Sequence, residues 1–133
     1  MGQRDLIERL ALVGLGGMIG ALLRYGAGGL VHRLFEGRFP LGTLLVNTAG
    51  CLAIGFLFTV AEDRGALSSY ARLFVFVGVL GGFTTFSSFG YETFTLWRDG
   101  LAARALLNVA FNVILGLGAV WLGHALARTI PGG

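Results

Sequence analysis

The stretch GGFTTFSSFGYET, residues 81–93, decides the fold. It lies inside a hydrophobic segment, residues 72–97, yet it consists mainly of glycines, hydroxyl side chains and phenylalanines, none of which is a strong helix former. In a membrane every backbone polar group must find a partner, and irregular backbone occurs only where protein buries it or where it lines a wet path. The sequence therefore predicts a membrane helix that is broken at Gly81 to Thr85.

The composition around this stretch is that of a membrane protein. The chain of 133 residues has room for one domain, which we assign to residues 1–133. It is 55% hydrophobic and only 13% charged, whereas roughly a quarter of the residues of a soluble domain are charged. Its ten basic residues are all arginine and lie between apolar runs, which disfavours a nucleic-acid partner and favours the lipid bilayer. The one cysteine, Cys51, cannot form an intrachain disulfide and is expected to pack in the interior.

Four apolar segments can be marked, and each is long enough to cross roughly 30 Å of hydrocarbon. They cover residues 10–31, 41–61, 72–97 and 105–127. The links between them are short, so consecutive segments are expected to be antiparallel neighbours. The sequence predicts an all-α membrane protein with four transmembrane helices, of which the third is broken.

The arginines near the segment ends give little preference for one orientation in the membrane. Basic residues flanking the helices normally set this orientation. The count is five against four, with Arg4, Arg9, Arg64, Arg72 and Arg128 on one side and Arg33, Arg38, Arg98 and Arg104 on the other. Two interpretations stay open. Uneven weighting of the first helix fixes one orientation, or the chain inserts both ways and forms an antiparallel homodimer with a two-fold axis in the membrane plane.

The first segment carries a small-residue face and a charge. Gly16 and Gly20 form a GxxxG pattern, which lets another helix approach closely. Arg24 follows four residues later, and an arginine at membrane depth costs about 2.5 to 3.5 kcal/mol on insertion scales. This cost indicates a function for Arg24, although a side chain near the helix end could also extend to the interface.

Amide side chains form polar stripes on the second and fourth segments. Thr43, Asn47 and Gly50 share one face of the second segment at helical spacing. Asn108 and Asn112 form an i, i+4 pair on the fourth. Each amide must be satisfied in the membrane, and it either joins two helices or offers its NH2 donors to a permeating solute.

The broken third segment could interact with ions of both signs. Carbonyl oxygens freed by the break would hold a small cation, as unwound backbone does in transporters. Beyond it, Phe86 and Phe89 flank Ser87 and Ser88, so aromatic ring edges border hydroxyl groups. Ring edges, hydroxyl hydrogens and amides all present partial positive charge, which suits weak binding of a small anion. Glu92 opposes this interpretation, because an ionised carboxylate would repel an anion.

Three runs of sequence resemble the Fluc/CrcB family of fluoride channels. They are GGMIGALLRY at 16–25, PLGTLLVN followed by GC within 40–51, and GGFTTFSSFGYE at 81–92. The resemblance covers all four segments in order. It implies a dual-topology, antiparallel homodimer with two fluoride pores and a central structural Na+, located in the bacterial plasma (inner) membrane as a multi-pass protein.

The resemblance also implies roles for single residues. The backbone carbonyls of Gly81 and Thr84 match those that hold the sodium ion, and Arg24 matches an arginine near the vestibule. In the fourth segment, many members of the family have tyrosine and serine where this chain has Asn108 and Asn112. Asparagine side chains are hydrogen-bond donors too. The residues expected along the fluoride pore are Asn47, Phe86, Ser87, Ser88, Phe89, Glu92, Asn108 and Asn112.

These observations favour a passive fluoride-selective channel that lets cytoplasmic fluoride leave a microbial cell. An enzyme is not expected, because the sequence has no phosphate-binding loop, no paired carboxylates and no nucleophile triad. The alternative is a small proton-coupled multidrug transporter of dual topology. Such transporters rely on a glutamate in the first helix, where this chain has Arg24.

Overall fold

The computed structural model describes residues 2–63, 65 and 67–130, and this part of the chain is helical without any strand. Arg64, one of the arginines counted for orientation, lies outside the described residues. The elements are α1 (Gln3–Leu34), α2 (Leu41–Asp63), α3 (Ser69–Arg72), the π-helix η1 (Leu73–Leu80), α4 (Gly81–Phe83), α5 (Phe86–Arg98) and α6 (Ala102–Arg128).

Four helical spans are long and apolar enough to cross a membrane, which confirms the predicted number of segments. The third of them runs through α3, η1, α4 and α5. The helices extend past the predicted ends because an apolar run marks only the part that lies in hydrocarbon. The first turns of α1, for example, are polar, and Arg9 Nε donates to Asp5 Oδ1 across 2.9 Å at i, i+4 spacing.

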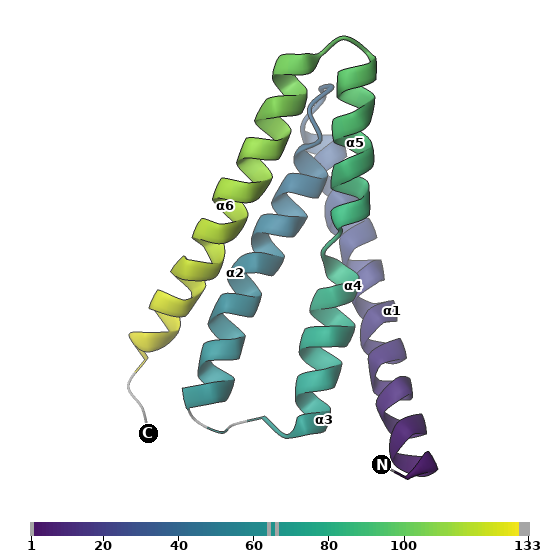
Figure 1. The fold of residues 1–133 in the computed structure, drawn as a ribbon, viewed down its shortest axis with the longest axis vertical. Coiled ribbons are helices and arrows are strands. Elements are labelled where there is room, and N and C mark those ends of the chain that lie inside the picture. The colour runs from purple at the N-terminus through teal and green to yellow at the C-terminus, as the bar shows by residue number, and fades with distance from the viewer. Residues whose placement is uncertain (1, 64, 66, 131–133) are drawn as a thin grey trace.

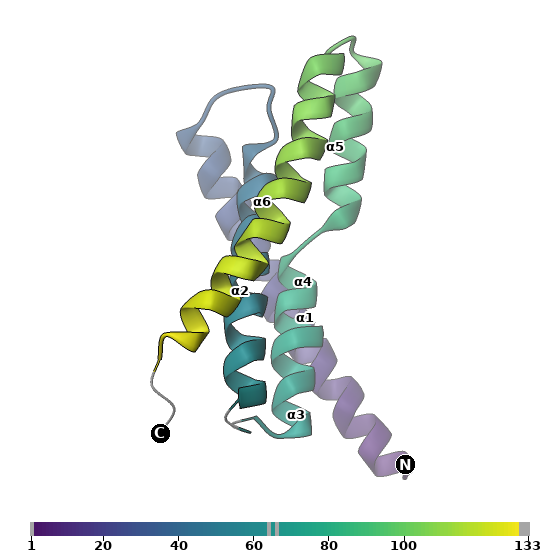
Figure 2. The ribbon, with the colours of Figure 1, turned by 60° about the vertical axis from the view of Figure 1, so that its left-hand side comes forward.

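The spans pack as neighbours in an up-and-down arrangement. α2 packs along α6, and α1 packs along η1 and α4 (Figure 1). α5 and α6 form a hairpin whose turn has Gly100 at a positive φ of 77°. The N–H of Leu101 donates to Leu96 O across 2.9 Å, as in a glycine-terminated helix end. Figure 2 shows that α5 is displaced sideways from the line of α4, so the third span changes direction at the break.

Glycines bring α1 into backbone contact with η1, as the GxxxG pattern predicts. Gly16 and Gly20 are the buried residues of α1. A Cβ atom on Gly16 would lie 2.6 Å from Phe74 O, and one on Gly78 would lie 2.9 Å from Gly16 Cα. Such distances leave no room for a side chain. Arg24 lies on the same face of α1, one helical turn beyond Gly20. The close packing of α1 therefore places Arg24 beside the end of α4.

The break in the third span is narrower than the predicted Gly81 to Thr85. α4 continues the helix through both glycines, and Gly81 has helical angles of φ −63° and ψ −38°. Only Thr84 and Thr85 are extended, with ψ angles of 158° and 113°. The prediction that the glycine pair unwinds is therefore wrong. Gly82 instead permits close packing, because a Cβ there would lie 2.5 Å from Gly17 O.

We expect Gly16→Ala to destabilise the protein by about 1–3 kcal/mol, because the added methyl group overpacks a backbone contact. Gly17→Ala is the matched control, since a Cβ on Gly17 meets nothing within 4 Å. The measurement is thermal unfolding in detergent micelles. Equal stability of the two variants would show that α1 and η1 are not in backbone contact.

Candidate functional site

The candidate site is built around the two extended residues between α4 and α5. Thr85 ends the break by capping the next helix, since its Oγ1 accepts the N–H of Ser88 across 3.2 Å. The Thr85 hydroxyl donates in turn to Ser88 Oγ across 3.0 Å. The chain therefore leaves one helix at Phe83 and starts another within two residues.

Asn47 of α2 bonds to both backbone polar groups of Thr85, its N–H and its carbonyl. Its Oδ1 accepts the Thr85 N–H across 2.8 Å, and its Nδ2 donates to Thr85 O across 3.1 Å. In an unbroken helix that N–H would donate to the carbonyl of Gly81. The amide of Asn47 thus replaces the helical bond that the break removes. This contact confirms the predicted polar face of α2: Thr43 and Asn47 bond to residues of the third span, and Gly50 lies against Thr84.

The amide network continues from Asn47 through α6 and returns to α5. Asn47 Nδ2 donates to Asn112 Oδ1 across 3.2 Å, and Asn112 Nδ2 donates to the backbone and side-chain oxygens of Asn108, each across 3.0 Å. Asn108 Nδ2 donates to Thr93 Oγ1, and the Thr93 hydroxyl donates to Phe89 O, both across 2.8 Å. The network therefore ties the first two turns of α5 to both α2 and α6.

The amide hydrogens of this network are largely used within the protein. Both hydrogens of Asn47 and both of Asn112 have protein acceptors. Asn108 is fully buried at 0% exposure and lies behind Asn112. Of the two roles left open for these amides, the geometry matches the joining of helices. By contrast, Ser88 Oγ accepts from Thr85, and the described residues supply no acceptor for its own hydrogen, which can therefore donate to a solute.

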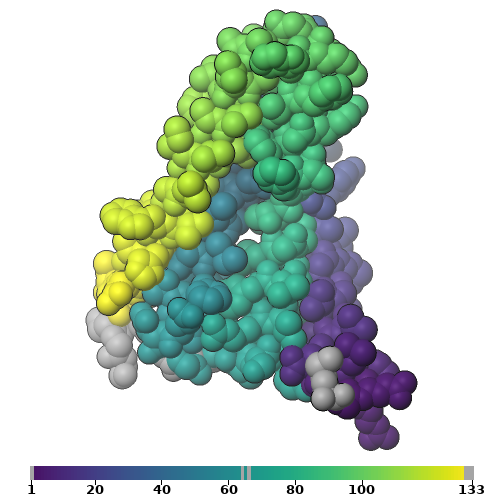
Figure 3. All heavy atoms as spheres, in the orientation of Figure 1, coloured from purple at the N-terminus to yellow at the C-terminus, as the bar shows by residue number. Residues whose placement is uncertain are grey.

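Phenylalanines and amides line one cavity, which we call the phenylalanine cavity. It has a volume of about 360 Å³ and lies between α2 and the break. Figure 3 shows a hollow there, between the teal of α2 and the green of α4 and α5. The predicted site residues on its wall are Asn47, Gly81, Thr84, Phe86, Phe89 and Asn112.

The two rings of this cavity have very different surroundings. Phe86 and Phe89 pack at 60° with their centroids 5.3 Å apart. Phe89 is 9% exposed, whereas Phe86 is 83% exposed. Because the ring of Phe86 is so exposed, a second protein surface could pack against it and form a path between the two. Ser87 is exposed beside it, and its Oγ lies 3.3 Å from Thr85 Oγ1.

Arg24 lines a second space, the arginine cavity, of about 600 Å³. Thr43, Ser88 and His32 also line it. Arg24 Nη1 donates to Thr84 O across 3.3 Å, so the guanidinium is directed at the helix break. The charge thus has a partner inside the protein, which favours a function for Arg24 over simple extension to the interface.

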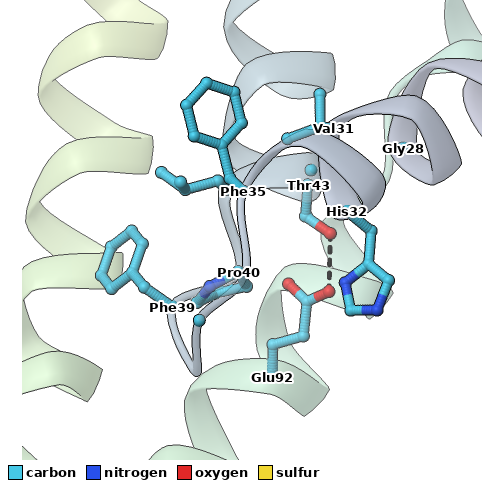
Figure 4. Close-up of a pocket in the computed structure, with 11 residues that line it drawn as sticks. Gly28, Val31, His32, Phe35, Phe39, Pro40, Thr43 and Glu92 are labelled. Carbon is cyan, nitrogen blue, oxygen red and sulfur yellow. Dashed lines mark hydrogen bonds between the residues drawn. The ribbon is translucent and has the colours of Figure 1, made fainter.

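Glu92 lies apart from the phenylalanines, in a third space of about 260 Å³ that we call the glutamate cavity. Thr43 Oγ1 donates to Glu92 Oε1 across 2.6 Å, and Figure 4 shows the ring of His32 beside this pair. The second carboxyl oxygen is buried and has no hydrogen-bond partner among the described residues. Glu92, whose charge would repel an anion, therefore does not line the phenylalanine cavity.

Sequence reasoning placed Thr85 and Thr93 in the broken stretch but gave their side chains no role, and it did not single out His32. Thr85 stands three residues before Ser88, a spacing typical of a helix N-cap, so its role had a signal in the sequence. Thr93 is tied to α6 by the bond from Asn108, and His32 joins the site from α1, so both roles depend on contacts between distant segments. No local pattern marks them.

The carbonyls at the break are suitable ligands for a hard cation. Gly81 O has lost the N–H that a continuous helix would supply, because Thr85 N–H bonds to Asn47. Within the part of the chain that the structure describes, Thr84 O accepts one side-chain bond, which comes from Arg24 and is long at 3.3 Å. Both lie at the C-terminal end of a helix, where the macrodipole favours positive charge. The donor set therefore fits Na+, which takes oxygen ligands.

Known proteins resemble this chain over almost its whole length. The family model described as "CrcB-like protein, Camphor Resistance (CrcB)" matches residues 11–124. The chain belongs to the CrcB family.

Several named proteins are also close in sequence to this chain. A protein of Thermus thermophilus, named "Fluoride-specific ion channel FluC", is 48% identical over 126 residues, which cover 95% of this chain and 100% of that protein. A protein of the same name from Nitratidesulfovibrio vulgaris is 41% identical over 93% of this chain and 100% of its own length. The one from Methylobacillus flagellatus is 44% identical over 90% and 94%. The match therefore extends over all four spans.

Proposed function

We propose that this protein is a fluoride-selective channel that lets cytoplasmic fluoride leave the cell by passive permeation. The single observation that carries the proposal is the phenylalanine cavity, where Phe86 and Phe89 meet the polar face of α2 beside a helix break. The names of the relatives, which are 41 to 48% identical, support the choice of fluoride as the anion. The proposed role is that of a channel and not of an enzyme.

The proposed path uses weak partial charges along most of its length. Arg24 attracts anions into the arginine cavity, where the hydroxyl of Ser88 donates a hydrogen bond. The edges of Phe86 and Phe89 then present their electropositive hydrogens. Weak binding at several positions allows an ion to enter and to leave, which conduction requires. The amides of Asn47 and Asn112 hold the walls of the path in place.

We propose further that two copies assemble as an antiparallel, dual-topology homodimer. The exposure of Phe86 supports this, because a second copy would cover the ring and complete the wall around it. The nearly even distribution of arginines supports insertion in both orientations. The test is labelling of single cysteines placed in a Cys51→Ser background. Labelling from both sides of the membrane is expected, and labelling from one side only would refute dual insertion.

A structural Na+ at the centre of this dimer is part of the proposal. The carbonyls of Gly81 and Thr84 from each copy would hold it. The ion would supply positive charge where carbonyl oxygens of two helix ends face each other. These carbonyls are backbone groups, so side-chain substitution at either position would leave the ligands in place.

The proposed location is the bacterial plasma (inner) membrane, and a growth experiment tests the function there. Expression in a bacterium that lacks its own fluoride exporter is expected to restore growth in fluoride. The alternative, a proton-coupled multidrug transporter, would instead raise resistance to cationic drugs. Drug resistance without fluoride resistance would overturn the proposed function.

A further inference from the structure

The end of α4 places one carbonyl next to one cation. Thr84 keeps its helical N–H bond to Leu80 O at 3.0 Å, while its ψ of 158° turns its own carbonyl out of the helix. The guanidinium of Arg24 donates to that carbonyl across 3.3 Å. A bond of this length is at the weak end for N–H···O geometry, so another cation could compete for the oxygen.

The position of Arg24 follows from the packing of α1. Gly16 and Gly20 hold α1 against η1 and α4 so closely that neither position has room for a side chain. Arg24 continues the same face one turn later, so this packing fixes its Cα near the break. The backbone contact brings Arg24 close to Thr84, and the hydrogen bond to Thr84 O places the guanidinium there.

No carboxylate in the described part of the chain neutralises this charge. The ion pairs of these residues join Arg9 with Asp5, Arg72 with Glu62 and Arg98 with Asp99, and Arg24 takes no part in them. Its acceptor is a neutral carbonyl. The positive charge of Arg24 is therefore not cancelled by an ion pair, and it repels a second cation that approaches Thr84 O.

We infer that Arg24 sets the sodium affinity of the helix break, by placing its guanidinium on the Thr84 carbonyl that the ion would share. The inference rests on the sodium site of the proposed function. The guanidinium and a sodium ion at the same carbonyl repel each other. The repulsion is substantial because the two charges would be only a few ångströms apart inside the protein. Arg24 therefore weakens sodium binding, and it satisfies Thr84 O whenever sodium is absent.

The experiment is a sodium titration of thermal stability. Purified protein in detergent is held at constant ionic strength with choline, and the midpoint of unfolding is followed as sodium replaces choline. An ion that binds only the folded protein stabilises it by RT ln(1 + [Na+]/Kd), so a fit of the midpoints against sodium concentration gives the Kd. We call this fitted Kd, at which half of the folded protein holds the ion, the half-effect concentration. We expect Arg24→Gln to lower the half-effect concentration about tenfold or more, since it removes a like charge within a few ångströms.

Three further variants make the result specific. Arg24→Met is a second neutral variant and is expected to behave as Arg24→Gln does, so the test survives if one of them fails to fold. Arg24→Lys keeps the charge and is expected to retain the wild-type half-effect concentration. Arg33→Gln removes an exposed charge from the same helix and is expected to have no effect.

Two results would overturn the inference. The first is a half-effect concentration in the neutral variants that equals or exceeds the wild-type value. The second is the absence of any sodium effect on the wild-type protein, which would remove the sodium site as well. Fluoride efflux from liposomes that contain the same wild-type preparation decides separately whether the protein is a channel. Failure of the inference and failure of the proposed function are thus distinguishable.

Discussion

Replacement of Phe86 or Phe89 by isoleucine is expected to slow fluoride efflux from liposomes about tenfold or more, while the protein remains folded. Isoleucine is bulky and apolar, so it fills much of the space of the ring. It lacks the electropositive edge that would face the anion. Each factor of ten in rate corresponds to about 1.4 kcal/mol, a realistic loss for an interaction in a site shielded from water.

Phe94→Ile is the matched control for these variants. Phe94 lies on the same helix and is 58% exposed, and it lines none of the three cavities described above. It is expected to conduct at the wild-type rate. Wild-type efflux by the Phe86 variant would show that its exposed ring does not border the path. Wild-type efflux by the Phe89 variant would show that the edge of this ring does not stabilise fluoride in the path.

Replacement of Asn47 by alanine is expected to destabilise the protein by about 1–3 kcal/mol and to abolish fluoride efflux. The variant loses both hydrogen bonds to the backbone of Thr85 and the bond to Asn112. The N–H of Thr85 then has neither its helical acceptor nor the amide, and such a group is costly inside a membrane. The expected consequence is a break with altered geometry, and with it a displaced first turn of α5.

Thr48→Ala controls for the loss of a polar side chain at the neighbouring position of α2. The side chain of Thr48 has no hydrogen bond among those that the described residues make. Thermal unfolding and fluoride efflux of both variants should be measured in parallel. If Asn47→Ala is as stable as Thr48→Ala, then the hydrogen bonds between Asn47 and the backbone of Thr85 do not stabilise the helix break.

Patterns within one helix predicted much of the fold correctly. Four apolar runs gave four spans, because crossing hydrocarbon requires a long uninterrupted apolar segment. The Gly16 and Gly20 pair predicted a close helix contact, and η1 provides it. The polar stripe of α2 predicted a face that bonds to another span, which Thr43 and Asn47 do. Each of these features depends on spacing along one helix.

Features that depend on two distant segments could not be predicted. The glycine pair at 81 and 82 indicated unwinding, but Gly82 is needed for contact with α1, which the local sequence does not reveal. From the sequence, the NH2 groups of Asn47 and Asn112 could have donated to a solute. In the structure both groups donate to acceptors within the protein. Glu92 was expected along the same path as Phe86, but it faces a cavity shared with α1 and α2. The roles assigned to these residues in fluoride permeation stay predictions.

Release of ions from liposomes that contain the purified wild-type protein tests fluoride-selective permeation directly. Liposomes loaded with fluoride and chloride are diluted into medium free of both, and ion-selective electrodes follow the two anions without any imposed proton gradient. A fluoride-selective channel is expected to release fluoride rapidly and completely while chloride is retained. Equal release of chloride, or fluoride movement only when a proton gradient is imposed, would contradict passive, fluoride-selective permeation.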